Sequence, residues 1–453
     1  MANTYLTRTP SSSGNRKTWT FSTWFKRSKI GAGQKIFCVQ GDSSNLFECY
    51  FNSNDTLAFY HYSSNGGVTD SFLGTNQVFR DTSAWYHLVL AVDTTQGTAS
   101  NRVKMYINGE QVTSFSSALY FNVNHDTYIN WTYEHRIGAS LSGALFFDGS
   151  MSHIHLIDGT AYDASAFGET DTTTGEWKAK TSPSVNYGTN GFLILKDGNT
   201  ITDQSSNSND FTLGGGTLTD LKDNPDNTFA TLNPLASTTP PANVGFTLSN
   251  GNNTAQYTNT SYANFTPSTI GFNKGKWYAE CKVSADGSFG GDWPEIGVFY
   301  SDNISDIQRT NEGSHIINSM VNGASIVGNG TLYKFGTQTS SYFSGFSTNN
   351  IISVAVDSDT GKIWWAVNGT FINSGNPTNG TNENATATAN KSLIFYSRWY
   401  QASNNTIVKW NFGNGYFGTT AVSSAGTNAS ENGIFEYDVP TGYTALSTKG
   451  LNL

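Results

Sequence analysis

Two histidines in the segment SHIHLID could act together on a metal ion. His153 and His155 are two positions apart, so in a strand, where side chains alternate, both would lie on one face. A His-x-His pair with a nearby carboxylate such as Asp148 can ligate zinc. No further ligand stands at a clear spacing, and paired histidines on a sheet more often pack or form hydrogen bonds. The three residues are therefore a weak metal candidate, and His87, inside WYHLVLAV, is expected to be structural.

A second polar group lies in the turn SDTG, which contains Asp359 and Gly361 and follows Asp357. This is half of the spacing found in calcium-binding loops, but the remaining aspartate and the closing glutamate are missing. A tight turn capped by aspartate side chains explains the segment better. No nucleophile with its base and no phosphate-binding glycine loop stands out in the chain, so the sequence predicts no catalytic residues.

Aromatic residues beside amides and carboxylates give the clearest binding signal. The segment NHDTYINWTYEH places Tyr128, Trp131 and Tyr133 among polar neighbours. Aromatic faces suit the C–H surfaces of sugar rings, while Asn and Asp side chains supply hydrogen bonds. For any single aromatic residue, packing into a core is the favoured alternative. The cluster at 128–133 is therefore the best candidate for a glycan- or partner-binding surface. Further candidates are Trp293, Trp399 and Tyr400.

The elements that position these residues are predicted to be strands. Short apolar runs recur at a spacing of ~8–12 residues, which is typical of a sandwich or barrel. One β-meander occurs twice, at 88–112 and 352–371, and each copy turns at Asn-Gly. That dipeptide favours the type I′ hairpin turn, because both central residues need a positive φ. No long segment has the apolar period of a helix, and AYDASAF could form one short turn.

Length and charge limit the organisation and the partners. With 453 residues, two domains are expected, 1–225 (in which 178–225 closes the first sandwich) and 226–453. The net charge is −9 and there is no basic run, so nucleic-acid binding is not expected. No apolar stretch is long enough to insert into a membrane, and the N-terminal segment lacks the apolar core of a signal peptide. The three cysteines are too few for a disulfide framework, so buried free thiols are expected.

Both predicted domains resemble known β-sandwich families. The first resembles the LamG-like, concanavalin A-type jelly roll in the segments FSTWFKR, WYHLVLAVD, VKMYINGEQV, RIGAS and FFDGSMSHIHLIDGTAYDASAF. The second resembles a SPRY domain in GKWYAECKV, EIGVFYSD, ISVAVDSDTGKIWWAVNGTF, VKWNFGNGYF and VPTGYTALST. The resemblance implies an all-β fold with two concanavalin-like antiparallel sandwiches in tandem. In SPRY domains variable loops bind partners, which here would include 310–315 and the loop 376–390. The latter is a polar segment that is expected to be exposed and unable to pack.

The resemblance also raises the question of catalysis, because concanavalin-like folds include glycoside hydrolases. Their glucanase branch places acids as Glu-x-Asp-x-x-Glu on one strand face. The nearest segment here does not have this spacing, since Glu169-Thr170-Asp171 is followed only by Glu176, and it is predicted to be a loop. A protein that is not an enzyme is therefore expected. Laminin-type jelly rolls sometimes bind calcium at a sheet rim, so bound calcium is kept as an alternative without assigned ligands. No other cofactor is expected.

The pairing of a jelly roll with a SPRY domain resembles virion proteins of tailed bacteriophages. This implies a tail- or head-fibre-type subunit, assembled in the host cytoplasm, that attaches to the host surface through glycan-binding loops. The implied partners are other virion proteins, a host-surface glycan or protein, and further copies of the chain, for example in a trimer. The alternative is a capsid decoration or connector protein that contacts only virion subunits. A glycan hydrolase is the third and least favoured hypothesis.

Overall fold

The computed structural model describes residues 3–42, 44–63, 68–198, 200–236, 246–257, 264–285, 294–303, 319–399 and 406–452. Trp293, Tyr400 and the loop 310–315 lie outside these ranges. The chain forms two compact units, Met1–Asp220 with Asn224–Asp226 and Leu221–Asp223 with Asn227–Leu453. The division between the two units falls within residues 220–227. Among the described residues, no helix is long and apolar enough to cross a membrane.

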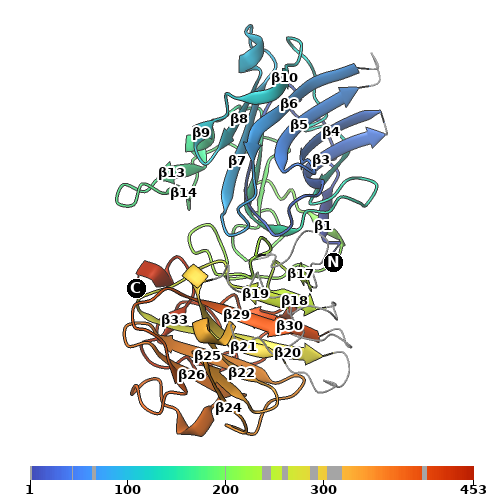
Figure 1. The fold of residues 1–453 in the computed structure, drawn as a ribbon. Coiled ribbons are helices and arrows are strands. Elements are labelled where there is room, and N and C mark those ends of the chain that lie inside the picture. The colour runs from blue at the N-terminus through green and yellow to red at the C-terminus, as the bar shows by residue number, and fades with distance from the viewer. Residues whose placement is uncertain are drawn as a thin grey trace. The chain divides into compact units, whose positions relative to one another are not determined.

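The first unit is a sandwich of two antiparallel sheets (Figure 1). The 8-stranded sheet has the order β10 (Phe115–Leu119), β6 (Val68–Val78), β5 (Thr56–Ser63), β4 (Asn45–Phe51), β3 (Gln34–Asp42), β11 (Glu134–Ile137), β1 (Tyr5–Arg8), β16 (Thr212–Gly215). The 6-stranded sheet has the order β15 (Phe192–Ile194), β12 (Gly149–Asp158), β2 (Thr18–Arg27), β7 (Tyr86–Asp93), β8 (Val103–Ile107), β9 (Glu110–Gln111). A separate hairpin joins β13 (Gly168–Thr170) to β14 (Trp177–Ala179), and the short helices are η1 (Ala99–Asn101) and η2 (Ala164–Ala166). Strands β15 and β16, which come from the segment 178–225, are edge strands of the 6-stranded and the 8-stranded sheet.

The central strand β2 shows how the sequence builds the core of this unit. Its alternating residues Trp19, Phe21 and Phe25 are fully buried between the two sheets. Trp24 points to the opposite face, where Trp85 and residues of β14 cover it. Because the hairpin β13–β14 covers that outer face, β2 is buried on both sides.

His87 belongs to this covered outer face and is structural, which confirms the prediction. Its ring stacks on Trp24 with centroids 4.8 Å apart. Its Nε2 lies 2.8 Å from Ser22 Oγ, and Trp177 Nε1 donates to its Nδ1 at 3.0 Å. Burial lowers the pKa of His87 to about 3, so the imidazole is neutral. The three cysteines are also buried and free, as predicted.

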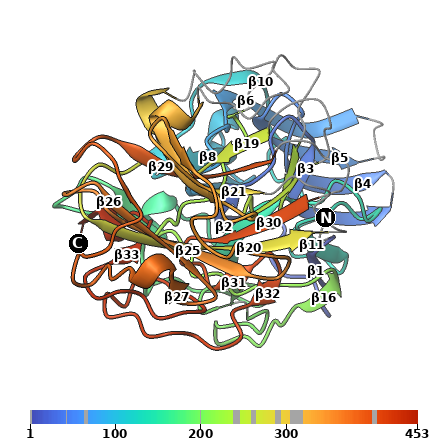
Figure 2. The same ribbon diagram turned by 60° about the horizontal axis from the view of Figure 1, so that its bottom comes forward.

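The second unit is likewise a sandwich (Figure 2). Its 9-stranded sheet has the order β17 (Phe246–Ser249), β18 (Thr254–Tyr257), β30 (Thr406–Asn411), β20 (Lys276–Ala285), β25 (Ile351–Asp357), β26 (Lys362–Val367), β27 (Thr370–Phe371), with β28 (Ala385–Thr386) on β26 and β33 (Thr444–Ala445) on β20. The 6-stranded sheet has the order β19 (Asn264–Pro267), β29 (Leu393–Trp399), β21 (Glu295–Tyr300), β22 (Gly323–Val327), β23 (Leu332–Lys334), β24 (Thr337–Thr339). The remaining elements are the pair β31 (Tyr416–Phe417) and β32 (Thr420–Ala421) and the short helices η3 (Ser301–Asn303), η4 (Ser319–Asn322), η5 (Ile372–Ser374) and η6 (Gly450–Asn452).

The structure corrects one expectation for this unit and confirms another. The loop 376–390 was expected to be exposed and unable to pack. Instead, Ala385 and Ala387 are buried in the core, and β28 pairs with β26. In the sequence, these two alanines stand within a polar segment and form no apolar pattern that would have predicted their burial. The turn at Asp357 is capped as predicted, because its carboxylate accepts hydrogen bonds from the backbone N–H groups of Asp359 and Thr360.

Glu280 of β20 is a buried carboxyl group in the second unit. It accepts hydrogen bonds from the Tyr278 hydroxyl at 3.1 Å and from the backbone N–H groups of Glu436 and Tyr437 at 2.8 and 2.9 Å. Burial outweighs these hydrogen bonds and raises the pKa of Glu280 to about 7. At pH values between the ordinary pKa of a glutamate and this raised pKa, Glu280 is protonated in the folded chain and has lost its proton in the unfolded chain.

The free energy of unfolding of the second unit should therefore fall as the pH rises from about 4.5 to 7, by on the order of 3 kcal/mol from this group. Replacement of Glu280 by Gln should flatten this part of the pH dependence. Urea unfolding at several pH values, followed by hydrogen exchange of peptides from β20, measures it. Glu431→Gln, at an exposed position of the same unit, is the matched control. An unchanged pH dependence in Glu280→Gln would show that the carboxyl group does not hold the proton.

Candidate functional site

The structure brings Tyr128, Trp131 and Tyr133 together in the segment between β10 and β11. Tyr128 and Trp131 stack with ring centroids 5.8 Å apart and an interplanar angle of 11°. Trp131 and Tyr133 are 4.4 Å apart at 35°. The three rings thus form one continuous cluster at an end of the first sandwich.

Buried polar residues fix the segment that bears this cluster. The backbone N–H of Thr127 donates to Arg16 O at 3.0 Å, and Trp19 Nε1 donates to Thr127 Oγ1 at 2.9 Å. Asn130 has a φ of 61° and donates through Nδ2 to Asp158 Oδ1 at 3.1 Å. Asparagine tolerates this left-handed conformation better than most residues. The aromatic side chains therefore sit on a backbone held by β2, β12 and the N-terminal segment.

The three rings differ in how far they are exposed to solvent. Tyr128 is 6% exposed and donates its hydroxyl to Asn45 Oδ1 at 2.7 Å, so it supports the cluster from inside. Trp131 and Tyr133 are half-buried. The guanidinium carbon of Arg16 lies 3.7 Å from the centre of the Trp131 ring, and Arg16 Nε donates to Thr127 O at 2.7 Å. We call Arg16, Trp131 and Tyr133 the arginine–aromatic patch.

The arrangement of the patch decides how a ligand could use it. Arg16 covers one face of Trp131, so a sugar would meet a guanidinium with its N–H donors next to aromatic rings, and not a bare stacking surface. Tyr133 lies across Gly41 of β3, where a Cβ atom would come within 2.2 Å of Tyr133 Cζ. The absence of a side chain at Gly41 is therefore what allows Tyr133 to lie against the strand. Arg16 and Gly41 carried no signal in the sequence.

Behind the patch lies a polar cluster that the sequence did not reveal. The ring of His61 stacks on Tyr128 with centroids 4.6 Å apart and an angle of 10°. Each of His61, Asp70 and His125 offers one atom that could ligate a metal ion, and these three atoms all lie within 4.8 Å of one another. These residues come from β5, β6 and the segment after β10, so no local motif could have indicated them. Only the tertiary fold brings them together.

The structure does not support the predicted metal candidate Asp148, His153 and His155. A β-bulge between Ser152 and His155 interrupts the alternation of β12, and His153 has a φ of 48°. The shared face on which the prediction rested is thus broken. His155 Nδ1 lies 2.9 Å from the Tyr187 hydroxyl in a buried environment. Among the described residues, the group with metal-ligand proximity is the cluster around His61 instead.

Two further candidates can be placed. Trp399 is 2% exposed and belongs to the core of the second unit, so its assignment to a binding surface was wrong. It ends β29 with its ring directed inward, a direction that the sequence pattern alone did not specify. Glu169 and Glu176 are exposed on the hairpin β13–β14. Asp171 caps the turn between them by accepting hydrogen bonds from the backbone N–H groups of Thr173 and Thr174.

The first unit is thus an antiparallel β-sandwich with a polar and aromatic end. Residues 2–165 match the family described as the Concanavalin A-like lectin/glucanases superfamily. The chain carries an N-terminal concanavalin-like domain of the LamG type, and its fold of tandem antiparallel β-sandwiches confirms the predicted fold class.

Solved structures similar to this chain include SPRY, pentraxin and carbohydrate-binding folds. The SPRY domain of human HERC1 is 14% identical, with 36% of this chain and 91% of that chain covered and a TM-score of 0.28. The SAP-like pentraxin from Limulus polyphemus is 15% identical, with 43% and 90% covered and a TM-score of 0.28. The CBM40 of the Ruminococcus gnavus IT-sialidase is 16% identical, with 33% and 80% covered and a TM-score of 0.25. A search of the curated proteins found no match.

Proposed function

We propose that this chain binds glycans through its first unit and that the arginine–aromatic patch contacts the sugar. The observation that carries the proposal is the pair of half-buried rings of Trp131 and Tyr133, fixed beside the Arg16 guanidinium at one end of a lectin-type sandwich. Rings of this kind contact the C–H surface of a sugar, and the guanidinium can donate to its hydroxyl or carboxylate oxygens. Exposed polar residues of the same segment could add hydrogen bonds: Asn122, Asn124, Asp126 and Thr132.

A glycan array probed with the full chain is the first test. We expect selective binding that falls about tenfold or more in Trp131→Ala, because an aromatic contact of a few kcal/mol is removed. Tyr60→Ala is the matched control, since Tyr60 is also half-buried in the first unit but stacks on Tyr62 of β5 and contacts Phe72 of β6 edge to face. Loss of binding in Tyr60→Ala with Trp131→Ala unaffected would place the sugar on the sheet and overturn the proposal.

The proposal includes binding without cleavage. The carboxylate spacing of the glucanase pattern is missing, and the nearest acids lie on an exposed hairpin. The purified chain should therefore release no reducing sugar from the polysaccharides it binds. Release that disappears on mutation of an acidic residue would contradict this part of the proposal.

We further propose that glycan binding serves attachment of a phage particle to its host. This part of the proposal rests on the resemblance of the paired domains to virion proteins. Under this proposal the chain is a tail- or head-fibre-type subunit that assembles with other virion proteins. Antibodies against the chain should then label intact particles at the tail or at fibres. Labelling of every capsomer, without glycan binding, would favour the decoration or connector role, and a lack of the protein in purified particles would refute a virion role.

A further inference from the structure

We infer that His61, Asp70 and His125 form a binding site for a divalent transition-metal ion of the zinc class. In this cluster His61 Nδ1 lies 3.0 Å and His125 Nε2 lies 3.9 Å from Asp70 Oδ2. The inference goes beyond glycan binding, since the ion would be held by residues behind the arginine–aromatic patch and can be measured without any sugar.

A β-bulge places the carboxylate of this site. Along the pairing of β5 with β6, His61 is opposite Ser71 and Tyr62 is opposite Thr69. Asp70 is the extra residue between these two pairs. A bulge re-aims the side chain of the extra residue, and bulges occur often next to functional sites. Asp70 can therefore face the imidazole of His61, which regular alternation would have prevented.

The second imidazole is placed by the segment that follows β10. The backbone N–H of Asn124 donates to Thr94 O, and Thr94 Oγ1 donates to His125 O, each at 2.8 Å. The ring of His125 stacks on Phe121 with centroids 4.8 Å apart. His125 is thus held by the end of β7 and by an apolar ring, and its Nε2 faces Asp70.

The polar atoms of the cluster are incompletely paired inside the protein. His61 is fully buried, and its Nε2 has no hydrogen-bond partner among the described residues, nor does the buried Nε2 of His125. An unpaired buried nitrogen costs about 1–3 kcal/mol, and such an atom in a native fold calls for an explanation. A bound ion accounts for the nitrogen of His125, because the metal takes its lone pair.

The charge states of the three side chains suit a cation. Burial lowers the pKa of His61 and also that of His125, so both imidazoles are neutral near pH 7. A neutral imidazole has one N–H and one lone pair, so His61 ligates a metal through Nδ1 in the tautomer that carries its proton on Nε2, and the metal then replaces the hydrogen bond from Nδ1 to Asp70. Burial alone would raise the pKa of Asp70, but hydrogen bonds from His61 and Ser63 and the nearby imidazoles hold it below its ordinary value. Two neutral imidazoles and one carboxylate are therefore available.

This donor set selects among metal ions. Two nitrogens and one oxygen suit zinc, cobalt or nickel, whereas calcium and magnesium prefer oxygen ligands alone. Tetrahedral zinc with bonds of 2.0–2.1 Å needs donor atoms ~3.3 Å apart. The observed 3.0 and 3.9 Å to Asp70 Oδ2 bracket this separation, and all three ligand atoms lie within 4.8 Å of one another, so ligation requires His125 to move closer. Three protein ligands leave one position for water or another oxygen ligand.

Titration of the tag-free full chain with zinc, after treatment with a chelator, tests the inference. We expect one ion per chain by calorimetry, no response to calcium, and visible absorption of a low-coordinate site when cobalt replaces zinc. His125→Ala and Asp70→Asn should each weaken binding about 100-fold or more, since each removes a ligand. His153→Asn is the histidine control, and asparagine tolerates the positive φ at that position.

Two results would overturn the inference. The first is the lack of stoichiometric zinc binding by the folded wild-type chain, in which case the cluster is a hydrogen-bonded core feature. The second is zinc affinity that stays unchanged in both His125→Ala and Asp70→Asn while His153→Asn abolishes it. Circular dichroism of each variant shows whether the fold is kept, and loss of binding counts only in a folded variant. If one variant unfolds, the other gives the answer.

Discussion

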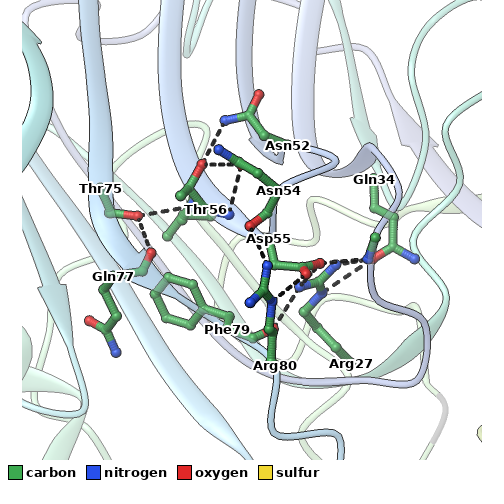
Figure 3. A network of polar contacts seen from close by, with 12 residues as sticks. Arg27, Gln34, Asn52, Asn54, Asp55, Thr56, Thr75, Gln77, Phe79 and Arg80 are labelled. Atoms are coloured by element: carbon green, nitrogen blue, oxygen red, sulfur yellow. Dashed lines mark hydrogen bonds and ion pairs between the residues drawn. The ribbon is translucent and has the colours of Figure 1, made fainter. Parts of the chain in front are cut away.

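Replacement of Asp55 by asparagine should lower the free energy of unfolding of the first unit by about 3–5 kcal/mol. Asp55 lies between two arginines (Figure 3), with Oδ1 3.0 Å from Arg27 NH1 and Oδ2 2.9 Å from Arg80 Nε. The side chain of Arg27 is 0% exposed, and that of Arg80 is 56% exposed. The substitution therefore leaves a buried guanidinium without its counter-charge. Asparagine keeps the shape of the side chain and tolerates the φ of 68° at this position.

The remaining contacts of Arg27 cannot replace the lost charge. Its NH1 donates to Phe79 O at 2.6 Å, and Gln34 Oε1 accepts from Nε and NH2 at 3.4 and 3.3 Å. These acceptors are neutral, so they satisfy hydrogen bonds without balancing the cation. The charge of the buried Arg27 is thus balanced by one carboxylate, that of Asp55 (Figure 3).

Urea unfolding read by hydrogen exchange of peptides from β2 and β6 reports on the first unit alone. Arg80→Ala is the control, and it should cost less than about 1 kcal/mol because an exposed ion pair contributes little. An Asp55→Asn variant within 1 kcal/mol of the wild type would contradict the assignment. So would an equal loss in the two variants.

Truncation of Trp365 to alanine should destabilise the second unit by about 3–5 kcal/mol. Trp365 in β26 is 0% exposed, lies in the main core of this unit, and donates through Nε1 to Ile296 O at 3.1 Å. The change removes a large apolar side chain and leaves the carbonyl oxygen of Ile296 without this donor. Both effects act in the same direction.

The same urea experiment, read on peptides from β25 and β26, measures this loss. Trp365→Phe is the matched control, because it keeps most of the ring volume and loses the hydrogen bond. It should therefore fall between the wild type and the alanine variant. An alanine variant as stable as the phenylalanine variant would show that the ring does not fill the core as described.

The sequence predicted the local turn chemistry of the fold well. Both Asn-Gly turns have the expected positive φ values, 49° and 87° at Asn108 and Gly109 and 48° and 78° at Asn368 and Gly369. Each asparagine also accepts a hydrogen bond through Oδ1 from a backbone N–H of the adjacent strand. Such features depend on residues next to one another in the chain, and sequence patterns contain that information.

The sequence could not assign strand faces where both sides of a sheet are buried. Trp364 and Trp365 are adjacent and both 0% exposed, because one faces the sandwich core and the other packs against Phe435 and Tyr443. Trp399 was misplaced for the same reason. When the chain covers the outer face of a sheet, an apolar residue no longer tells which side is solvent.

The same distinction between local and tertiary features applies to the candidate site. Tyr128, Trp131 and Tyr133 are close in sequence, so their clustering could be predicted. Arg16 could not be, since it contacts Trp131 only in the folded chain. The bulge at Asp70 depends on strand register, which is set by the whole sheet and not by the segment itself.

Hydrogen exchange of the full chain, with and without a saturating saccharide chosen from the glycan array, tests the central claim most directly. Binding at the arginine–aromatic patch predicts slower exchange in the segment 121–134 and around Arg16, with little change along β4 and β5 away from them. Protection confined to the second unit, or to the sheet surface around Tyr60, would contradict glycan recognition by the patch.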